Sequence, residues 1–158
     1  MMLRALVLSA LWLARTRADA ADNDPRPLVT CAFKWAQSAS EVHLFVKYAH
    51  KLDAPAVNDA GAPAVTVLPG SLLVEAESKS KRLRLELDLA RAVDPARSSH
   101  ERGTFGVTIV LVKASRASWP RLLAPPPGGK KAGRVHAHRW WEMEEKFDAE
   151  ARATHPLL

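Results

Sequence analysis

Hydrophobic and polar residues alternate with a period of two through the first two thirds of the chain. The clearest run is KRLRLELDL, in which leucines occupy every second position from Leu83 to Leu89 and charged residues fill most of the others. This period is that of a β-strand with one buried side and one solvent-facing side. The alternation predicts strands over 28–37, 41–48, 81–89 and 105–113, and two shorter strands around Pro69-Gly70.

Polar segments rich in turn-forming residues separate these strands. Residues 37–40 have the length of a hairpin connection, 52–63 are rich in Pro, Asn, Asp and Gly, and 90–103 have the composition of a loop. No helical period interrupts the series. Short strands at this spacing predict an all-β fold, an antiparallel β-sandwich of about seven strands.

The pattern changes after Leu123. Residues 124–134 form a Pro- and Gly-rich linker that cannot join a core. Beyond it, Trp140, Met143, Phe147 and Ala151 recur at the spacing of one helical face and predict a short amphipathic helix. We therefore expect the sandwich to cover 28–123 and to carry a flexible C-terminal tail, 135–158, that contains this helix.

The first 20 residues have the layout of a secretory signal peptide. MMLRALVLSALWLARTRADA contains an early arginine, a short apolar run and an Ala-Asp-Ala step that is similar to a cleavage site. The apolar run is about half the length that a bilayer-spanning helix needs, so we expect no stable membrane span. This interpretation predicts a protein of the secretory pathway or the endoplasmic reticulum lumen. Arg15 and Arg17 keep two alternatives open: a transit peptide to another organelle, or an uncleaved start and a location in the cytoplasm and nucleus.

Charge and cysteine content limit the classes of function. The formal net charge of +6 falls to about +4 if the leader is removed, and the remaining Lys and Arg residues are scattered without interleaved aromatic residues. We therefore expect no binding to nucleic acid. Cys31 is the single cysteine and lies at an apolar strand position, so we expect a buried thiol and no intrachain disulfide.

Four short pieces, in order, carry a resemblance to a known family. They are Trp35 on the first strand, Asp94-Pro95 after the leucine-rich strand, Lys113 at the end of the last strand, and the sequence Trp119-Pro120-Arg121-Leu122. With these pieces the segment 28–123 resembles the CS domain, in particular that of the small co-chaperone of heat-shock protein 90. The resemblance implies a sandwich of the CS and small-heat-shock-protein type. It also implies a module that docks on the ATP-bound, closed form of a chaperone, with a tail that contacts the chaperone or its clients. The chain departs from that co-chaperone in its basic charge and in a tail that is only mildly acidic.

The Trp-Pro-Arg-Leu sequence also has a physical interpretation. Pro120 cannot donate to a strand ladder and therefore ends the pairing, while Trp119 provides a large apolar cover. Arg121 remains as a planar donor group that can pair with a carboxylate of this chain or of a partner. We expect Lys113 and Arg121 to face a partner, although local ion pairs and structural closure by Trp119 and Pro120 remain open. The predicted partner-binding residues are Lys113, Trp119, Pro120, Arg121, Leu122, Trp140, Trp141, Met143 and Phe147. For the tail residues among them, folding back onto the sandwich is the alternative.

The sequence does not favour an enzyme. Prostaglandin E synthase activity has been credited to the co-chaperone family and linked to a tyrosine directly after the first-strand tryptophan, whereas this chain has Ala36 there. No arrangement of nucleophile and base and no phosphate-binding loop is visible, so we expect no cofactor. His136 and His138 lack a third ligand at a suitable spacing, so we expect no metal.

The predicted function is therefore that of a co-chaperone that binds a heat-shock protein 90 class chaperone and assists the folding of its clients. Two alternatives remain: an independent luminal client-binding chaperone, and an interaction module of the nuclear-distribution-protein-C type. The latter usually ends in Trp-Trp-x-Arg-Leu rather than Trp-Pro-Arg-Leu. The chain lacks the Ile-x-Ile/Val tail that small heat-shock proteins use for assembly, so we expect a monomer.

Overall fold

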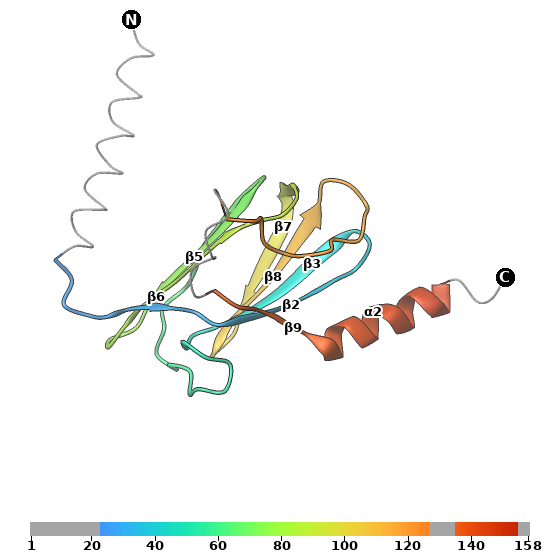
Figure 1. Ribbon diagram of the computed structural model, residues 1–158. Coiled ribbons are helices and arrows are strands. Elements are labelled where there is room, and N and C mark those ends of the chain that lie inside the picture. Colours follow the sequence, from blue (N-terminus) through green and yellow to red (C-terminus); the bar gives the residue numbers. More distant parts are fainter. Residues whose placement is uncertain (1–22, 127–134, 155–158) are drawn as a thin grey trace, which may run out of the picture.

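The structure is a computed structural model that describes residues 23–126 and 135–154, and it shows two β-sheets with one helix extending from an edge (Figure 1). Sheet A has the strand order β1 (Leu28–Thr30), β6 (Arg82–Asp88), β5 (Ser71–Glu77) and β4 (Ala64–Leu68). Sheet B has the order β7 (Val93–Arg102), β8 (Gly106–Lys113), β3 (Glu41–Lys47), β2 (Phe33–Gln37) and β9 (Ala137–Arg139). The helix α2 spans Trp141–Thr154. The predicted all-β sandwich is confirmed.

The core lies between the two sheets and follows the alternation in the sequence. On β6, Leu83, Leu85 and Leu87 are buried, whereas Arg84 and Glu86 face outward. The same alternation appears on β3 and, from Val107 onward, on β8, so each sheet turns one side to the core. The β4–β5 hairpin turns at Pro69-Gly70, as the sequence predicts.

The first predicted strand, 28–37, divides between the two sheets. β1 runs parallel to β6 in sheet A, and β2 runs antiparallel to β3 in sheet B. The chain crosses between them at Cys31 and Ala32, whose amides donate to the carbonyls of Arg84 and Ala49. The alternation continues through this crossing because the buried side faces the same core in both sheets, so the sequence pattern could not reveal it.

The loop predicted over 90–103 is wrong, because most of it forms β7. This strand pairs with β8 at both ends, with a bulge between Asp94 and Ser99. Inside the bulge the Ser98 hydroxyl donates to the Asp94 carbonyl and accepts from the Val112 amide. A bulge on an edge strand tolerates Pro95, which cannot donate a ladder hydrogen bond. The segment is polar because β7 is an edge strand that is mostly exposed, and this polarity made it resemble a loop.

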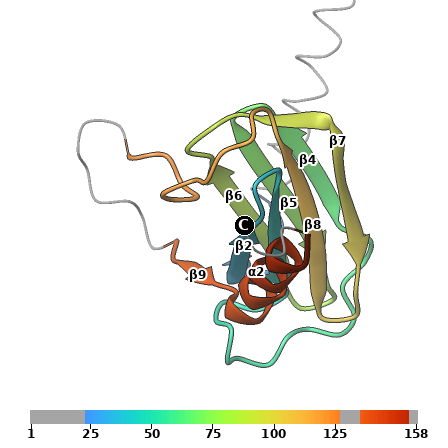
Figure 2. The ribbon, with the colours of Figure 1, turned by 90° about the vertical axis from the view of Figure 1, so that its right-hand side faces the viewer.

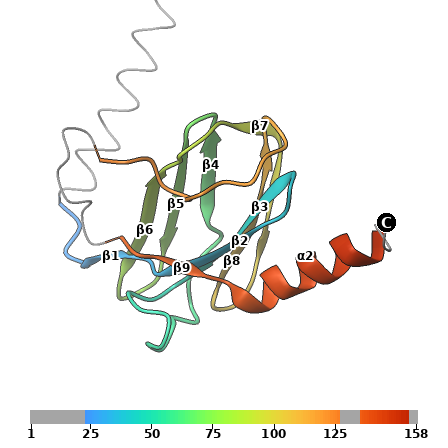
Figure 3. The same cartoon turned by 45° about the vertical axis from the view of Figure 1, so that its right-hand side comes forward.

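The described part of the predicted tail is not free. β9 adds a parallel edge strand to β2, and α2 leads away from that edge past the end of sheet B (Figures 1 and 3). Viewed along its axis in Figure 2, α2 lies beside sheet B rather than sheet A. Residues 135–154 thus follow the alternative in which the tail folds back onto the sandwich, and they contain the predicted short helix. Most of the linker, 127–134, and the last residues, 155–158, lie outside the described residues.

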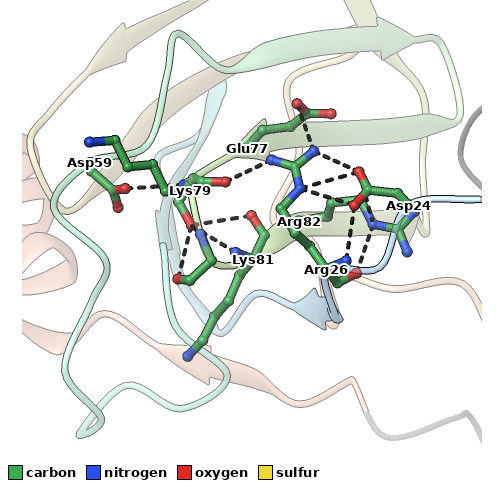
Figure 4. Close-up of polar contacts among 9 residues, drawn as sticks. Asp24, Arg26, Asp59, Glu77, Lys79, Lys81 and Arg82 are labelled. Carbon is green, nitrogen blue, oxygen red and sulfur yellow. Dashed lines mark hydrogen bonds and ion pairs between the residues drawn. The ribbon is translucent and has the colours of Figure 1, made fainter.

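Polar contacts fix the start of the described chain to sheet A (Figure 4). Arg26 forms an ion pair with Asp24, with Nη2 and Oδ2 2.6 Å apart, and donates to the Ser78 carbonyl at 2.7 Å. The hydrogen bonds from Arg26 hold the pKa of Asp24 well below its usual range. The sandwich therefore holds the chain from Asp24 onward. The predicted leader, 1–20, lies outside the described residues. Within the described ranges, no helix has the length and apolar character required to cross a bilayer.

Candidate protein-interaction surface

The segment Trp119–Leu122, here called the closing segment, runs across one end of the sandwich. Trp119 and Leu122 are buried in the core, with 2% and 1% of their surface exposed. After Leu122 the chain reaches sheet A, where the Ala90 amide donates to the Leu122 carbonyl and the Ala124 amide donates to the Asp88 carbonyl. The closing segment therefore connects the two sheets and covers the end of the core.

The side-chain amide of Gln37, at the end of β2, holds the start of the closing segment. Its Nε2 donates to the Trp119 carbonyl at 2.8 Å, and its Oε1 accepts from the Trp119 amide at the same distance. These two hydrogen bonds replace the backbone pairing that a neighbouring strand would provide, so they position the backbone that leads into Pro120. Nothing in the sequence pattern marks Gln37, because a strand-terminal polar residue is usually solvated.

Lys113 is part of the same network and is buried, with 5% of its surface exposed. Its ammonium donates to Gln37 Oε1 at 2.8 Å and to the Ser38 carbonyl at 2.7 Å, and lies 5.7 Å from the centre of the Trp119 ring. Burial lowers the pKa of Lys113 to about 8. This value is still above 7, so the ammonium is mostly protonated at pH 7. The expectation that Lys113 faces a partner is therefore not met in the structure. Its ammonium instead donates to acceptors within the chain, including the backbone carbonyls of Ser38 and Ala117.

The predicted site residues separate into an inner and an outer group. Lys113, Trp119 and Leu122 belong to the interior, whereas Pro120 and Arg121 lie between them in sequence and are exposed. The arrangement presents one proline and one guanidinium on a backbone that is anchored on both sides. Such anchoring reduces the conformational entropy that Arg121 would lose when it binds a carboxylate.

Trp140 joins the tail to the outer face of sheet B. Its amide donates to the Trp35 carbonyl at 2.8 Å, and its ring lies 6.2 Å from that of Phe45. The Lys34 ammonium is 4.8 Å from the centre of the Trp140 ring, which is the range of a cation–π contact. Trp140 therefore contacts both strands of the β2–β3 hairpin.

Arg139 connects β9, β2 and α2. Its guanidinium lies 4.8 Å from the Trp35 ring and 5.8 Å from the Trp141 ring, and it forms an ion pair of 2.6 Å with Glu144. Trp141 remains 64% exposed and is the most exposed large hydrophobic residue in the described part of the chain. Sequence reasoning did not single out Arg139, because its contact with Trp35 joins residues about a hundred positions apart along the chain.

Phe147 and Met143 continue the helix face that Trp140 begins, and both are half-buried. The Phe147 ring lies over His43 on β3, with the ring centroids 4.7 Å apart. Next to His43 in the ladder is Ala36, which has no exposed surface although it points away from the core. Trp140 and Phe147 thus lie on the sandwich, and Met143 between them is half-buried. Among the predicted aromatic residues of the tail, only Trp141 is open to solvent.

A cleft of about 460 Å³ separates α2 from the loop that precedes the closing segment. The β2–β3 turn forms its floor, Arg116, Ala117 and Ser118 form one wall, and Phe147 and Asp148 contribute to the other. The cleft brings the tail helix close to the chain that leads into Trp119. The two predicted partner-binding regions therefore lie on the same end of the molecule.

The described residues show no arrangement that would hold a metal: among them, no three His, Cys, Asp or Glu side chains converge. His136 and His138 are exposed, with ring centroids 6.4 Å apart. Cys31 is buried, and burial raises the pKa of its thiol to about 12. A thiol with so high a pKa is a poor nucleophile and a poor metal ligand at neutral pH.

No protein-family model matches the chain, and no curated protein matches it. Among solved structures, the nuclear movement protein from E. cuniculi GB-M1 matches with a TM-score of 0.43 and 15% identity, over 58% of this chain and 98% of its own. The CS-b5R domains of human Ncb5or, in the NAD+ form, match with a TM-score of 0.46 and 21% identity, over 62% of this chain and 26% of that chain. Heat shock protein 16.0 from Schizosaccharomyces pombe matches with a TM-score of 0.43 and 13% identity, over 61% and 97%.

Proposed function

We propose that the chain is a CS-type co-chaperone that binds a heat-shock protein 90 class chaperone and assists protein folding without catalysing a reaction. The observation that carries the proposal is the closing segment. Trp119 and Leu122 anchor it in the core, and Pro120 and Arg121 are presented at the surface between them. A rigid backbone that exposes a single guanidinium suits recognition of a carboxylate on a folded partner.

The composition of this surface supports protein binding rather than binding of a small molecule. The cleft near it is open to solvent and is lined by Arg116, and the closing segment and α2 add the exposed Arg121 and Trp141. Arg and Trp are the residue types most often found at the energetic centre of protein interfaces. We therefore place the chaperone contact at this end of the sandwich.

The proposal has a direct test in binding of the full-length protein to a purified heat-shock protein 90 class chaperone with a non-hydrolysable ATP analogue. We expect binding in the presence of the analogue and a several-fold lower association rate for Arg121→Ala, because exposed charges act mainly on association. Arg97→Ala on β7 is the matched control, since it removes the same charge from an exposed position on another edge. Absence of binding with every nucleotide would refute the co-chaperone proposal.

A second candidate is an independent client-binding chaperone, and the exposed Trp141 favours it. This candidate needs no large partner. It is distinguished by suppression of the aggregation of a model client by the purified protein alone. For location we propose the secretory pathway, on the basis of the leader in the sequence, with the chaperone of that compartment as the partner.

A further inference from the structure

The tail is attached to the sandwich by a small set of contacts. β9 pairs with β2 over three residues, and all three are exposed. Most residues of α2 are also exposed. The pairing of one three-residue strand contributes little stability by itself. The side-chain contacts of Trp140, Arg139 and Phe147 therefore provide most of the attachment.

The surface that the tail covers combines a strand edge with apolar side chains, which is unusual for a surface exposed to solvent. β2 is paired with β3 on one side, and β9 supplies the pairing on its other side. Next to this edge, Ala36 is fully buried, and the half-buried Phe45 ring contacts Trp140. Without the tail, β2 would become an open sheet edge beside an apolar patch, which is the type of surface that accepts an additional strand.

We propose that the edge of β2, together with the outer-face patch of Ala36, His43 and Phe45, is an acceptor site for an extended segment of an incompletely folded polypeptide. The chain's own tail, residues 135–154, occupies this site in the closed state. This inference adds a binding site for client segments to the proposed function. It rests on that function only to the extent that the chain binds other proteins.

The way the tail is bound indicates which segments fit. Residues 137–139 pair through the backbone, which requires no particular sequence. The residue that follows, Trp140, places an aromatic ring on Lys34 and Phe45. Further along, Phe147 places an apolar group on His43. A fitting segment is therefore extended, lacks proline at the paired positions and has an aromatic residue directly after them, as exposed core strands of unfolded proteins do.

Competition with the tail controls access to this site. A tethered tail has an effective concentration of about the millimolar range for a short flexible connection, so a client segment binds the native chain weakly. A weaker tail should bind client segments more tightly without any change in the acceptor surface. This gives the proposal a test in which only the competitor is altered.

The experiment uses full-length protein and a fluorescein-labelled peptide of residues 135–147 as the probe, with binding followed by fluorescence anisotropy. Trp140→Ala with Phe147→Ala weakens the tail, and Glu142→Ala with Glu145→Ala is the matched control at exposed positions of the same helix. We expect the peptide to bind the first variant at least tenfold more tightly than it binds the native chain or the control. A peptide that carries Trp140→Ala should lose most of this binding. Equal binding to all three proteins, or no binding to the tail-weakened one, overturns the proposal.

A disulfide lock provides a second measurement that does not depend on the fold of the weakened variant. Lys34 and His138 are direct partners in the β2–β9 register, so Lys34→Cys with His138→Cys places two thiols at neighbouring strand positions. Adjacent strands are about 4.8 Å apart, which is within the range for a disulfide. The reduced form should bind the peptide at least tenfold more tightly than the oxidised form. Equal affinity of the two forms would contradict the inference.

The oligomeric state of the native protein gives a further check. Formation of a dimer by tail exchange in the native protein would make a second copy the occupant and overturn the assignment to a client segment. The peptide experiments contain no chaperone. Failure of the chaperone-binding test therefore leaves the acceptor site standing, and failure of the peptide test leaves the co-chaperone proposal standing.

Discussion

The imidazole of His43 lies against the Phe147 ring, with 4.7 Å between ring centroids, and its Nε2 has no hydrogen-bond partner in the described part of the chain. A carboxylate oxygen of Glu41 is 3.8 Å away. Lys146 and Glu150 of α2 also act on the ring, with opposite effects. Burial outweighs the acidic neighbours and lowers the pKa of His43. The docked tail therefore favours the neutral imidazole.

Attachment of the tail should consequently depend on pH. A histidine whose pKa is lowered by docking binds more protons when the tail is released, so docking is strongest above the ordinary histidine pKa of about 6.5 and weakens as the pH falls below it. We expect fluorine-labelled tryptophan NMR to show a growing population of released Trp140 as the pH falls from 7 to 5. His43→Phe keeps the ring contact without the charge, so its tail should stay docked over the same range. A native spectrum that does not change with pH would contradict this assignment.

Lys113 and Arg121 should differ sharply in their effect on stability. Lys113→Met removes the ammonium that donates to the Ser38 and Ala117 carbonyls and one of the two donors to Gln37 Oε1, which keeps the Trp119 amide. It should lower the free energy of unfolding by about 1–3 kcal/mol. Arg121→Ala, at an exposed position, should change it by no more than about 0.5 kcal/mol. Urea unfolding of both variants measures the difference. Equal effects would mean that Lys113 is not the structural cation of the closing segment.

The register of β6 leads to a similar comparison within one strand. Leu85 is in the centre of the core, and its replacement by alanine should cost about 2–5 kcal/mol. Arg84, on the next position, pairs on the outer face with Glu75 and Glu86, and exposed pairs contribute little. Arg84→Ala should therefore stay within about 0.5 kcal/mol in thermal or urea unfolding. If Arg84→Ala were the more destabilising change, the register would be shifted by one residue.

Much of the sandwich could be predicted from such alternation. The leucines of β6 and the hairpin at Pro69-Gly70 show patterns that depend only on nearby residues, and the structure confirms both. β7 escaped prediction because an exposed edge strand with a proline in its bulge has no apolar face to detect. β9 escaped because a strand of three exposed residues exists only through its pairing with β2, about a hundred positions earlier.

The candidate site was predicted less well than the fold. The Trp-Pro-Arg-Leu sequence indicated an apolar cover by Trp119, which is buried in the structure. It could not show that the Lys113 ammonium donates to Gln37 Oε1 and to two backbone carbonyls. Burial of a lysine depends on acceptors gathered from separate elements. The spacing of Trp140, Met143 and Phe147 predicted a helix and its apolar face, whereas the surface that receives this face is a property of the folded sheet.

Cys31 should serve as a reporter of global unfolding. Its thiol is buried and its pKa is raised to about 12, so the native protein should react with a thiol reagent such as DTNB only slowly at pH 8. In denaturant the same cysteine should react at the rate of an ordinary thiol. Rapid labelling without denaturant would show that the crossing between β1 and β2 opens in the native state.

The leader gives a prediction about the mature protein. Cleavage near Ala20 would keep Asp24 and its ion pair with Arg26, so the sandwich would lose none of its described contacts. We expect amino-terminal sequencing of the protein from its native cells to begin close to Ala21. Recovery of a mature chain that begins with Met1 or Met2 would exclude the secretory interpretation.

The order of synthesis gives the β2–β9 pairing a further consequence. β2 ends at Gln37, and the strand that covers its edge begins at Ala137, so about 100 residues are made between the two. At about 5–20 residues per second, the edge of β2 remains uncovered for about 5–20 seconds in every newly made chain. Each molecule therefore passes through a period in which this edge can pair with other nascent polypeptides before its own last strand arrives.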